Sequence, residues 1–385
     1  MGPLEGVRVL EIGGVGPTPF CGMMLADLGA EVVRFERAGA GVLETSPKDP
    51  LLRGRRSISL NLKQPRAIEV ALRLVESADV LIEGFRPGVA ERLGLGPQVC
   101  LARNSRLIYG RMTGWGQEGP LAQAAGHDIN YIALSGALHL IGTPGGKPVP
   151  PLNLVADFGG GGMLLALGVL AALHEVRRSG QGQVVDATML DGVAAMMAMY
   201  FGFRAQGQFR DRTGENFLAG AAPYYDVYET KDGAYVAIGS LEPQFYAELL
   251  ERLGLDRERY AASGMPALDE ATRRERWPEL REAIASAFRS RTRAEWCERL
   301  EGTDVCFAPV LSLEEAPCHP HNLARGTFME VDGLLQNAPA PRFSRSTLDA
   351  PRPPRKPGED SDALLCEAGY SEAEIEILRR EGALS

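Results

Sequence analysis

The 385-residue sequence has few cysteines, and they are not paired. Its six cysteines are scattered along the chain and form no Cys-x-x-Cys motif. In a chain of this length, such spacing indicates reduced thiols rather than a disulfide framework. Residues 1–14 also lack the basic segment and the following apolar segment of a signal peptide. We therefore expect a cytoplasmic protein.

An excess of basic residues is also missing. The chain has 41 Lys and Arg residues against 50 Asp and Glu residues, which gives a net charge of −9. Binding to the nucleic-acid backbone requires a basic surface. We therefore expect no nucleic-acid partner, although a local basic pocket for a small phosphorylated ligand stays compatible with this charge.

Long apolar runs are absent as well. The most apolar stretch, residues 163–173, covers about half a membrane span and contains Gly168. We expect it to form a buried helix, and we expect no contact with a membrane. What remains is an ordinary globular composition, with 45% hydrophobic and 24% charged residues.

The first half of the chain alternates predicted strands with predicted helices. Strands separated by helices indicate a mainly parallel, Rossmann-like sheet that carries helices on both faces. The fold class is therefore α/β. We expect strands over residues 7–12, 31–35, 79–82, 106–111 and 183–188, and helices over residues 17–28, 65–77, 163–177 and 190–203.

The pattern changes in the second half of the chain. Residues 224–239 predict a β-hairpin that turns at Asp232-Gly233, and further helices follow it. These features indicate a smaller α+β domain. We expect a large domain over residues 1–205, a linker over 206–225, the small domain over 226–320, and a return segment over 321–385 that packs on the large domain.

A glycine-rich run, Gly13-Gly14-Val15-Gly16-Pro17, follows the first predicted strand. In a dinucleotide-binding fold such a turn contacts the pyrophosphate. The spacing here is not Gly-x-Gly-x-x-Gly, and Pro17 has no N–H to donate. We interpret the run as a tight turn between a strand and a helix rather than an NAD site.

A possible metal motif is equally weak. Cys318, His319 and His321 stand close together, but their spacing is not that of a zinc site. We expect no metal.

Three short polar runs contain candidates for acid–base chemistry. His127 lies between Gly126 and Asp128, and a carboxylate beside an imidazole can shift the pKa of either group. Asp157 precedes a predicted helix, where it is either an N-cap or a catalytic carboxylate. Glu242 also precedes a helix, where a glutamate usually only starts the helix. The spacing alone leaves each of these choices open.

Basic residues fall near the ends of several predicted strands. In an open α/β sheet, that edge is where ligands bind, and arginine suits phosphate groups. We therefore expect a phosphate-bearing ligand in this acidic protein. The candidates are Arg37, Arg53, Arg55, Arg56, Lys63, Arg86 and Arg92.

Taken together, the motifs resemble CoA-transferase family III, the CaiB/BaiF superfamily, over nearly the whole chain. The matching runs are residues 4–11, 26–34, 61–63, 79–88, 182–186 and 369–371. The resemblance implies an interlocked homodimer of ring-shaped subunits, in which each site combines the large domain of one subunit with the small domain of the other. It also implies acyl-CoA as substrate and no separate cofactor. It places CoA against Arg37, Leu60, Asn61, Leu62, Lys63, Gly84, Phe85, Arg86 and Arg92, and against Gly126, Ile129, Asn130 and Tyr131.

Within the family, residues 111–116 and 126–131 resemble the α-methylacyl-CoA racemase branch, as do Asp157 and Glu242. By this resemblance His127 and Asp157 are the acid–base pair, and Glu242 hydrogen-bonds His127. The implied reaction is racemisation at the α-carbon of 2-methylacyl-CoA thioesters through an enolate-like intermediate, in fatty acid and lipid metabolism.

Two other functions stay open from the sequence. In the transferase branch of the family an aspartate is acylated, and Asp128 is the residue that matches it. The alternative is therefore a transferase that moves CoA between carboxylic acids through an Asp128 acyl-anhydride. The third hypothesis is a protein that binds acyl-CoA without catalysis.

Overall fold

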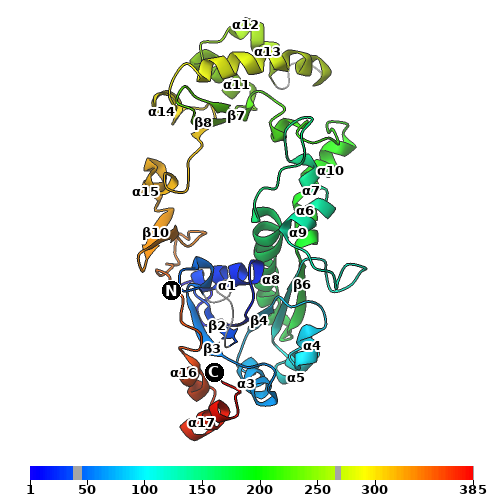
Figure 1. The fold of residues 1–385 in the computed structure, drawn as a ribbon, viewed down its shortest axis with the longest axis vertical. Coiled ribbons are helices and arrows are strands. Elements are labelled where there is room, and N and C mark those ends of the chain that lie inside the picture. Colours follow the sequence, from blue (N-terminus) through cyan, green and yellow to red (C-terminus); the bar gives the residue numbers. More distant parts are fainter. Residues whose placement is uncertain (38–45, 265–269, 385) are drawn as a thin grey trace. The chain divides into compact units, whose positions relative to one another are not determined.

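The computed structural model describes residues 1–37, 46–264 and 270–384, which divide into two compact units (Figure 1). Unit 1 consists of Met1–Ser135, Pro151–Met196 and Ala324–Ser385, and unit 2 of Gly136–Pro150 and Met197–Leu323. The expected large domain ran unbroken over residues 1–205. The structure instead assigns residues 136–150 and 197–205 to unit 2, so the chain crosses between the units more often than the sequence indicated.

Unit 1 is built on a six-stranded parallel sheet in the order β3-β2-β1-β4-β5-β6. This confirms the mixed α/β fold with a parallel sheet. The order reverses between β1 and β4, which is where open α/β sheets bind ligands. The strands are β1 (Arg8–Ile12), β2 (Glu31–Glu36), β3 (Arg55–Ser59), β4 (Val80–Glu83), β5 (Ile108–Thr113) and β6 (Gln183–Thr188).

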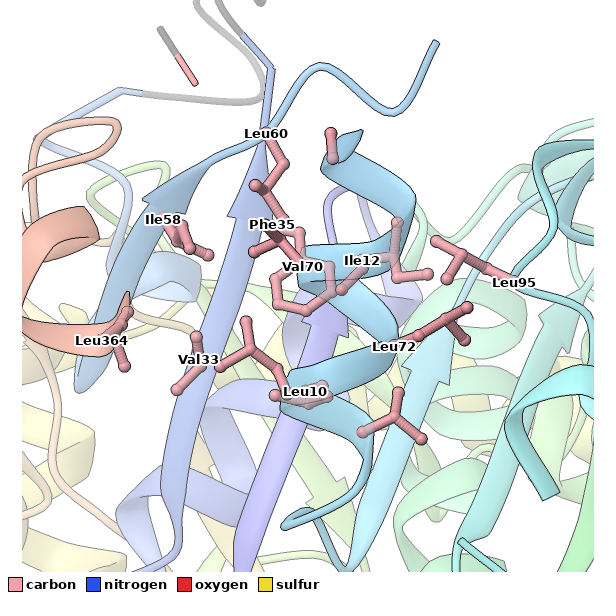
Figure 2. Close-up of a cluster of buried hydrophobic side chains, with 14 of the residues drawn as sticks. Leu10, Ile12, Val33, Phe35, Ile58, Leu60, Val70, Leu72, Leu95 and Leu364 are labelled. Atoms are coloured by element: carbon pink, nitrogen blue, oxygen red, sulfur yellow. The ribbon is translucent and has the colours of Figure 1, made fainter. Parts of the chain in front are cut away.

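Helices cover both faces of this sheet. Figure 2 shows one face, where alternating strand residues such as Leu10 and Val33 pack against Val70 of α3 and Leu364 of α16. On β5, Gly110 lies against Leu165 of α8. The helical segments of unit 1 are α1 (Pro17–Asp27), η1 (Pro50–Leu52), α3 (Pro65–Val75), α4 (Val89–Leu93), α5 (Pro97–Arg103), α6 (Asp128–Leu134), η2 (Leu154–Met163), α8 (Leu164–Ser179), α9 (Met189–Met196), α16 (Ser361–Glu367) and α17 (Glu372–Arg380).

The segment η2 is π-helical and continues directly into α8. Its glycines allow close packing, because a Cβ at Gly160 would lie 2.9 Å from the Val193 nitrogen of α9. Among the described residues, Leu154–Ser179 is the one helix long and apolar enough to cross a membrane. The expected buried helix is only half correct, since Leu165 and Val169 are buried whereas Met163 and Leu167 are exposed.

The return segment completes unit 1. It contains a hairpin of β10 (Phe328–Val331) and β11 (Leu334–Asn337), followed by α16 and α17. Residues near its end cover the edge strand β3, since Asp360 accepts a hydrogen bond from the Ser57 N–H at 2.9 Å.

Unit 2 contains a three-stranded antiparallel sheet of β7 (Tyr225–Glu229), β8 (Tyr235–Gly239) and β9 (Phe307–Pro309). The predicted hairpin with its Asp232-Gly233 turn is therefore confirmed. The single helix expected over residues 190–203 is wrong, because the structure breaks it after Met196. The helical segments of unit 2 are α7 (Ala137–Leu140), α10 (Ala198–Ala205), η3 (Phe217–Ala219), α11 (Pro243–Arg252), α12 (Arg257–Tyr260), η4 (Ala261–Ser263), α13 (Glu270–Phe288), α14 (Arg293–Leu300) and η5 (Ala316–Cys318). The chain returns to unit 1 within α15 (Pro320–Arg325).

Candidate active site

A cavity of about 490 Å³ opens at the carboxyl ends of the central strands of unit 1. It lies at the switch point between β1 and β4, since Gly13 follows β1 and Gly84 follows β4. Of the expected CoA contacts in the first hundred residues, all but Arg86 and Arg92 line it. The lining residues are Ile12, Gly13, Gly14, Val15, Thr18, Arg34, Phe35, Glu36, Arg37, Leu60, Asn61, Leu62, Lys63, Gly84, Phe85 and Leu93.

The glycine-rich run is more than a turn. Gly13, Gly14 and Val15 line the cavity. Gly16, which has a φ of 72°, faces the Asp157 carboxyl. A Cβ placed at Gly16 would lie 3.4 Å from Oδ2 of Asp157. The run therefore lies between the cavity and Asp157. It is rich in glycine because its backbone passes close to the cavity on one side and close to the Asp157 carboxyl on the other.

Three of the arginines expected near phosphate are engaged elsewhere. Arg53 donates to Asp27 at 3.0 Å, and Arg55 donates to Glu11 at 3.0 Å, and both guanidinium groups are buried. Arg56 pairs with Glu31 and Glu367. Arg55 and Arg56 link β3 to neighbouring elements, and Arg53 links α1 to β11 through Asp27 and Gln336. A phosphate-binding role for the three arginines is therefore wrong.

His127 stands at the N-terminus of α6, where its side chain is exposed. Its backbone N–H donates to Oδ1 of Asn130 at 3.0 Å, which fixes the start of the helix. The next residue, Asp128, is 4% exposed. The helix therefore presents the imidazole outward and turns the neighbouring carboxylate into the protein.

Asp128 fastens α6 to η2. Its Oδ2 accepts hydrogen bonds from the backbone N–H groups of Ala156 at 2.6 Å and Asp157 at 2.9 Å. His127 and Asp157, 30 positions apart in the sequence, are therefore held in one region by the residue that follows the histidine. This arrangement indicates a positioning role for Asp128, which the sequence had marked as a possible nucleophile.

The Asp157 carboxyl is half-buried and its pKa is raised, chiefly by burial and further by the negative charge of Asp128. Two contacts oppose this rise, a hydrogen bond from Nδ2 of Asn153 at 3.0 Å and the charge of His127. The opposing effects of Asp128 and His127 show that both groups lie within electrostatic range of Asp157. A raised pKa allows this carboxyl to hold a proton closer to neutral pH.

The remaining residues of the 126–131 run flank His127 and Asp128 in the sequence. Tyr131 is buried and packs edge-to-face on Trp115, with ring centroids 4.7 Å apart. Burial and Asp157 raise the pKa of Tyr131, whereas Arg86 lowers it, so Arg86 also lies near this region. Gly126 lies against the Trp115 and Tyr131 rings, while Ile129 is exposed. Gly126, Ile129, Asn130 and Tyr131 lie outside the lining of the cavity.

Glu242 belongs to unit 2, where it occupies the N-cap position of α11 but its side chain makes no capping hydrogen bond. Its charge adds to burial in raising the pKa of the Cys306 thiol. Within a single unit, the structure therefore brings together His127, Asp128 and Asp157 but not Glu242.

A metal cluster of three or more His, Cys, Asp or Glu side chains is not found in the part of the chain that the structure describes. In the Cys318–His321 run, Nε2 of His319 lies 3.0 Å from the Glu301 carboxylate.

Sequence reasoning missed several cavity residues, including Arg34, Glu36 and Thr18. The signal for Arg34 and Glu36 was their place at the end of a parallel strand, beside the predicted Arg37. Reading the whole strand end, rather than its exposed arginine alone, would have found them.

A doubly wound α/β sheet with a cavity at its switch point, together with a histidine and a carboxyl group held near each other, is the arrangement of an α/β enzyme. The chain matches CoA-transferase family III over residues 4–361 and belongs to this family. The mouse protein named α-methylacyl-CoA racemase is 46% identical over 376 residues, which cover 97% of this chain and 95% of the relative. The human protein of the same name is 43% identical over 382 residues, with coverage of 97% and 95%.

Solved structures agree with this placement. A CaiB/BaiF family protein from Brucella suis superposes with a TM-score of 0.80 at 26% identity, covering 95% of this chain and 99% of that chain. The family predicted from the sequence is confirmed.

Proposed function

We propose that this enzyme racemises 2-methylacyl-CoA thioesters by removing the α-proton and returning a proton to the opposite face. The observation that carries the proposal is the pair of hydrogen bonds that the Ala156 and Asp157 backbone N–H groups donate to the Asp128 carboxylate, because they bring an imidazole and a carboxyl group to one place. The two mammalian relatives named as racemases support it.

The chemistry needs one protonated and one unprotonated group on opposite sides of the α-carbon. A neutral His127 facing a protonated Asp157 meets this need for one enantiomer, and imidazolium facing carboxylate meets it for the other. General acid–base catalysis of this kind contributes about 10²–10⁴-fold. The raised pKa of Asp157 suits a carboxyl group that must carry the proton in half of the catalytic cycle.

The enolate oxygen needs stabilisation of its own. The first turn of a helix leaves N–H groups without partners inside the helix. We propose that those at the start of α6, beside Asp128, donate to this oxygen, which is worth roughly 3–4 kcal/mol per donor in comparable sites. In this scheme CoA is part of the substrate, and the reaction takes no separate cofactor and no metal.

The CoA moiety is proposed to occupy the 490 Å³ cavity. Arg37 and Lys63 in its lining suit the phosphates, with Arg86 and Arg92 as further contacts. Since Gly16 separates the cavity from Asp157, a thioester that leaves the cavity past this glycine reaches the acid–base pair.

The complete site is proposed to form in an interlocked homodimer, with Glu242 of one subunit holding the His127 imidazole of the other. Exposed apolar side chains on η2, α8 and α9, among them Leu154, Leu167 and Met196, support a protein partner on that surface. We further propose a cytoplasmic role in fatty acid and lipid metabolism.

The test is deuterium exchange in D₂O. The wild-type enzyme is expected to replace the α-proton of a 2-methylacyl-CoA with deuterium and to interconvert the enantiomers. His127→Ala is expected to slow the interconversion, and the exchange of the enantiomer whose α-proton faces His127, by about 10²–10⁴-fold. His321→Ala, which removes an exposed histidine of α15, is the matched control and should behave as wild type. Undiminished interconversion of the enantiomers in His127→Ala would overturn the assignment.

The transferase alternative has its own signature. An Asp128 acyl-anhydride would be trapped by hydroxylamine as a mass change on that residue. We expect no such change, because the carboxylate is buried and its Oδ2 is already bonded to two N–H groups.

A further inference from the structure

The Arg34 side chain contacts the glycine-rich run and, among the described residues, pairs with acceptors on Glu11, Glu36 and Gly14. It forms an ion pair with Glu11, donates from Nε to Oε1 of Glu36 at 3.3 Å, and donates from Nη2 to the carbonyl oxygen of Gly14 at 3.1 Å. Arg34 is 2% exposed and also lines the cavity. One guanidinium therefore joins β1, β2 and the loop that follows β1.

Glu11 is fixed from its other side. Arg55 donates from Nε and Nη2 to Oε2 of Glu11 at 3.1 and 3.0 Å, and it also donates to the Pro19 carbonyl at the start of α1. A side chain at Gly22 of α1 would collide with the Glu11 carboxylate. Glu11 is thus enclosed by β3 and α1, and it gives Arg34 a rigid anchor.

Such a buried network persists only when each charge is paired, because an unpaired buried charge is strongly destabilising. Arg34 and Arg55 oppose Glu11 and Glu36, and Ser57 donates a further hydrogen bond to Glu36. Most of these bonds stabilise the sheet. The bond to Gly14 differs, because its acceptor is a backbone carbonyl of the loop that lies between the ligand cavity and Asp157.

Among the described residues, two hydrogen bonds link the loop between β1 and α1 to β2. The Gly13 N–H donates to the Phe35 carbonyl at 3.0 Å, and the Gly14 carbonyl accepts from Arg34. Two residues later, Gly16 faces the Asp157 carboxyl. The position of the Gly14 carbonyl therefore affects two things: the shape of the cavity wall, and the space between Gly16 and the Asp157 carboxyl.

We propose that Arg34 is a positioning residue that holds the Gly13–Gly16 loop, so that the bound CoA and the Asp157 carboxyl keep a fixed spacing. The ligand's identity rests on the proposed function. Lysine at this position would have one nitrogen for three acceptors, whereas the planar guanidinium serves them all. A misplacement of about 1 Å in such a site can cost on the order of 10²-fold in rate.

The test compares Arg34→Lys with Arg56→Lys. Arg56 also forms ion pairs from the sheet, with Glu31 and Glu367, but it does not line the cavity. We expect Arg34→Lys to weaken CoA binding about tenfold in calorimetry and to lower kcat by about 10²-fold, with Arg56→Lys within about twofold of wild type in both. Wild-type CoA affinity and kcat in Arg34→Lys would overturn the proposal.

If Arg34→Lys does not fold, Gly13→Ala decides the question. Its Cβ would lie 2.9 Å from the Phe35 carbonyl oxygen and would displace the same loop without removing a charge. Unchanged CoA affinity and kcat in that variant would also overturn the proposal. Calorimetry keeps this test apart from the proposed function, because a wild-type protein that binds CoA without exchanging the α-proton would refute racemisation only.

Discussion

Asp128 is the residue on which the candidate site depends. Its side chain bonds the backbone 28 and 29 positions further along the chain, so the peptide plane of Asp157 cannot move independently of His127. The same carboxylate also acts through space, because its charge helps to raise the pKa of Asp157. One residue thus holds the Asp157 backbone and adds to the effect of burial in raising the pKa of the Asp157 carboxyl.

The protonation of Asp157 gives a prediction at the residue scale. Asn153 donates to the carboxyl at 3.0 Å and lowers its pKa, so Asn153→Ala should raise that pKa further. The acid limb of the pH–rate profile falls where both groups of the pair become protonated. It should therefore move to higher pH, by up to about one pH unit.

Steady-state rates over a range of pH would measure this. The rate at the plateau should change little, because Asn153 does not donate or accept the transferred proton. An acid limb that stays in place, or moves to lower pH, would contradict the assignment of Asp157 to the titrating pair.

At the scale of elements, η2 carries Asp157 and is positioned by glycine contacts. Gly160 packs on α9, where a Cβ would lie 2.9 Å from the Val193 nitrogen and 3.0 Å from the Met189 oxygen. Both are backbone atoms, which cannot rotate away as a side chain would. Gly160→Ala should therefore lower the free energy of unfolding by about 1–3 kcal/mol.

Urea denaturation measures this difference, and Gly202→Ala is the matched control. Gly202 lies in α10 with nothing within 4 Å of its Cβ position. Alanine there should stabilise the protein by about 0.5–1 kcal/mol, because glycine is unfavourable inside a helix. If the two variants had equal free energies of unfolding, the close contact of Gly160 with α9 would not be needed for stability, and the prediction would be wrong.

Most elements of unit 1 follow from local patterns, but β3 does not. Its sequence begins with Arg55 and Arg56, which reads as a solvated segment. The charges are accepted in the sheet because Glu11 pairs with Arg55 and Glu367 pairs with Arg56. Those partners come from distant parts of the chain, so no pattern within the strand shows them.

The residues of the candidate site also fall into those that a local sequence pattern predicts and those that depend on distant parts of the chain. Residues such as Asn61 and Lys63 could be predicted as cavity residues because they belong to recognisable motifs. The engagement of Arg53 with Asp27, and the bonds of Asp128 to the η2 backbone, depend on tertiary packing. The same holds for the break after Met196, where a continuous apolar pattern crosses from one compact unit to the other.

At the scale of the whole molecule, the proposed homodimer predicts complementation between inactive subunits. If each site takes His127 from one subunit and Glu242 from the other, a mixed dimer of His127→Ala and Glu242→Ala contains one intact site. With random pairing after co-expression, about a quarter of wild-type activity should return.

Each variant expressed alone provides the control and should stay inactive. If both residues of a site came from the same subunit, no mixed dimer would contain an intact site. Co-expression would then recover nothing, and the shared-site arrangement would be refuted.

The central claim is that His127 and Asp157 serve opposite faces of one carbon atom. Deuterium incorporation by Asp157→Asn, measured separately on each enantiomer of a 2-methylacyl-CoA, tests it most directly. We predict that one enantiomer, whose α-proton faces His127, still exchanges without inversion, while the other loses exchange. Equal exchange of both enantiomers in this variant, or continued racemisation, would contradict the account.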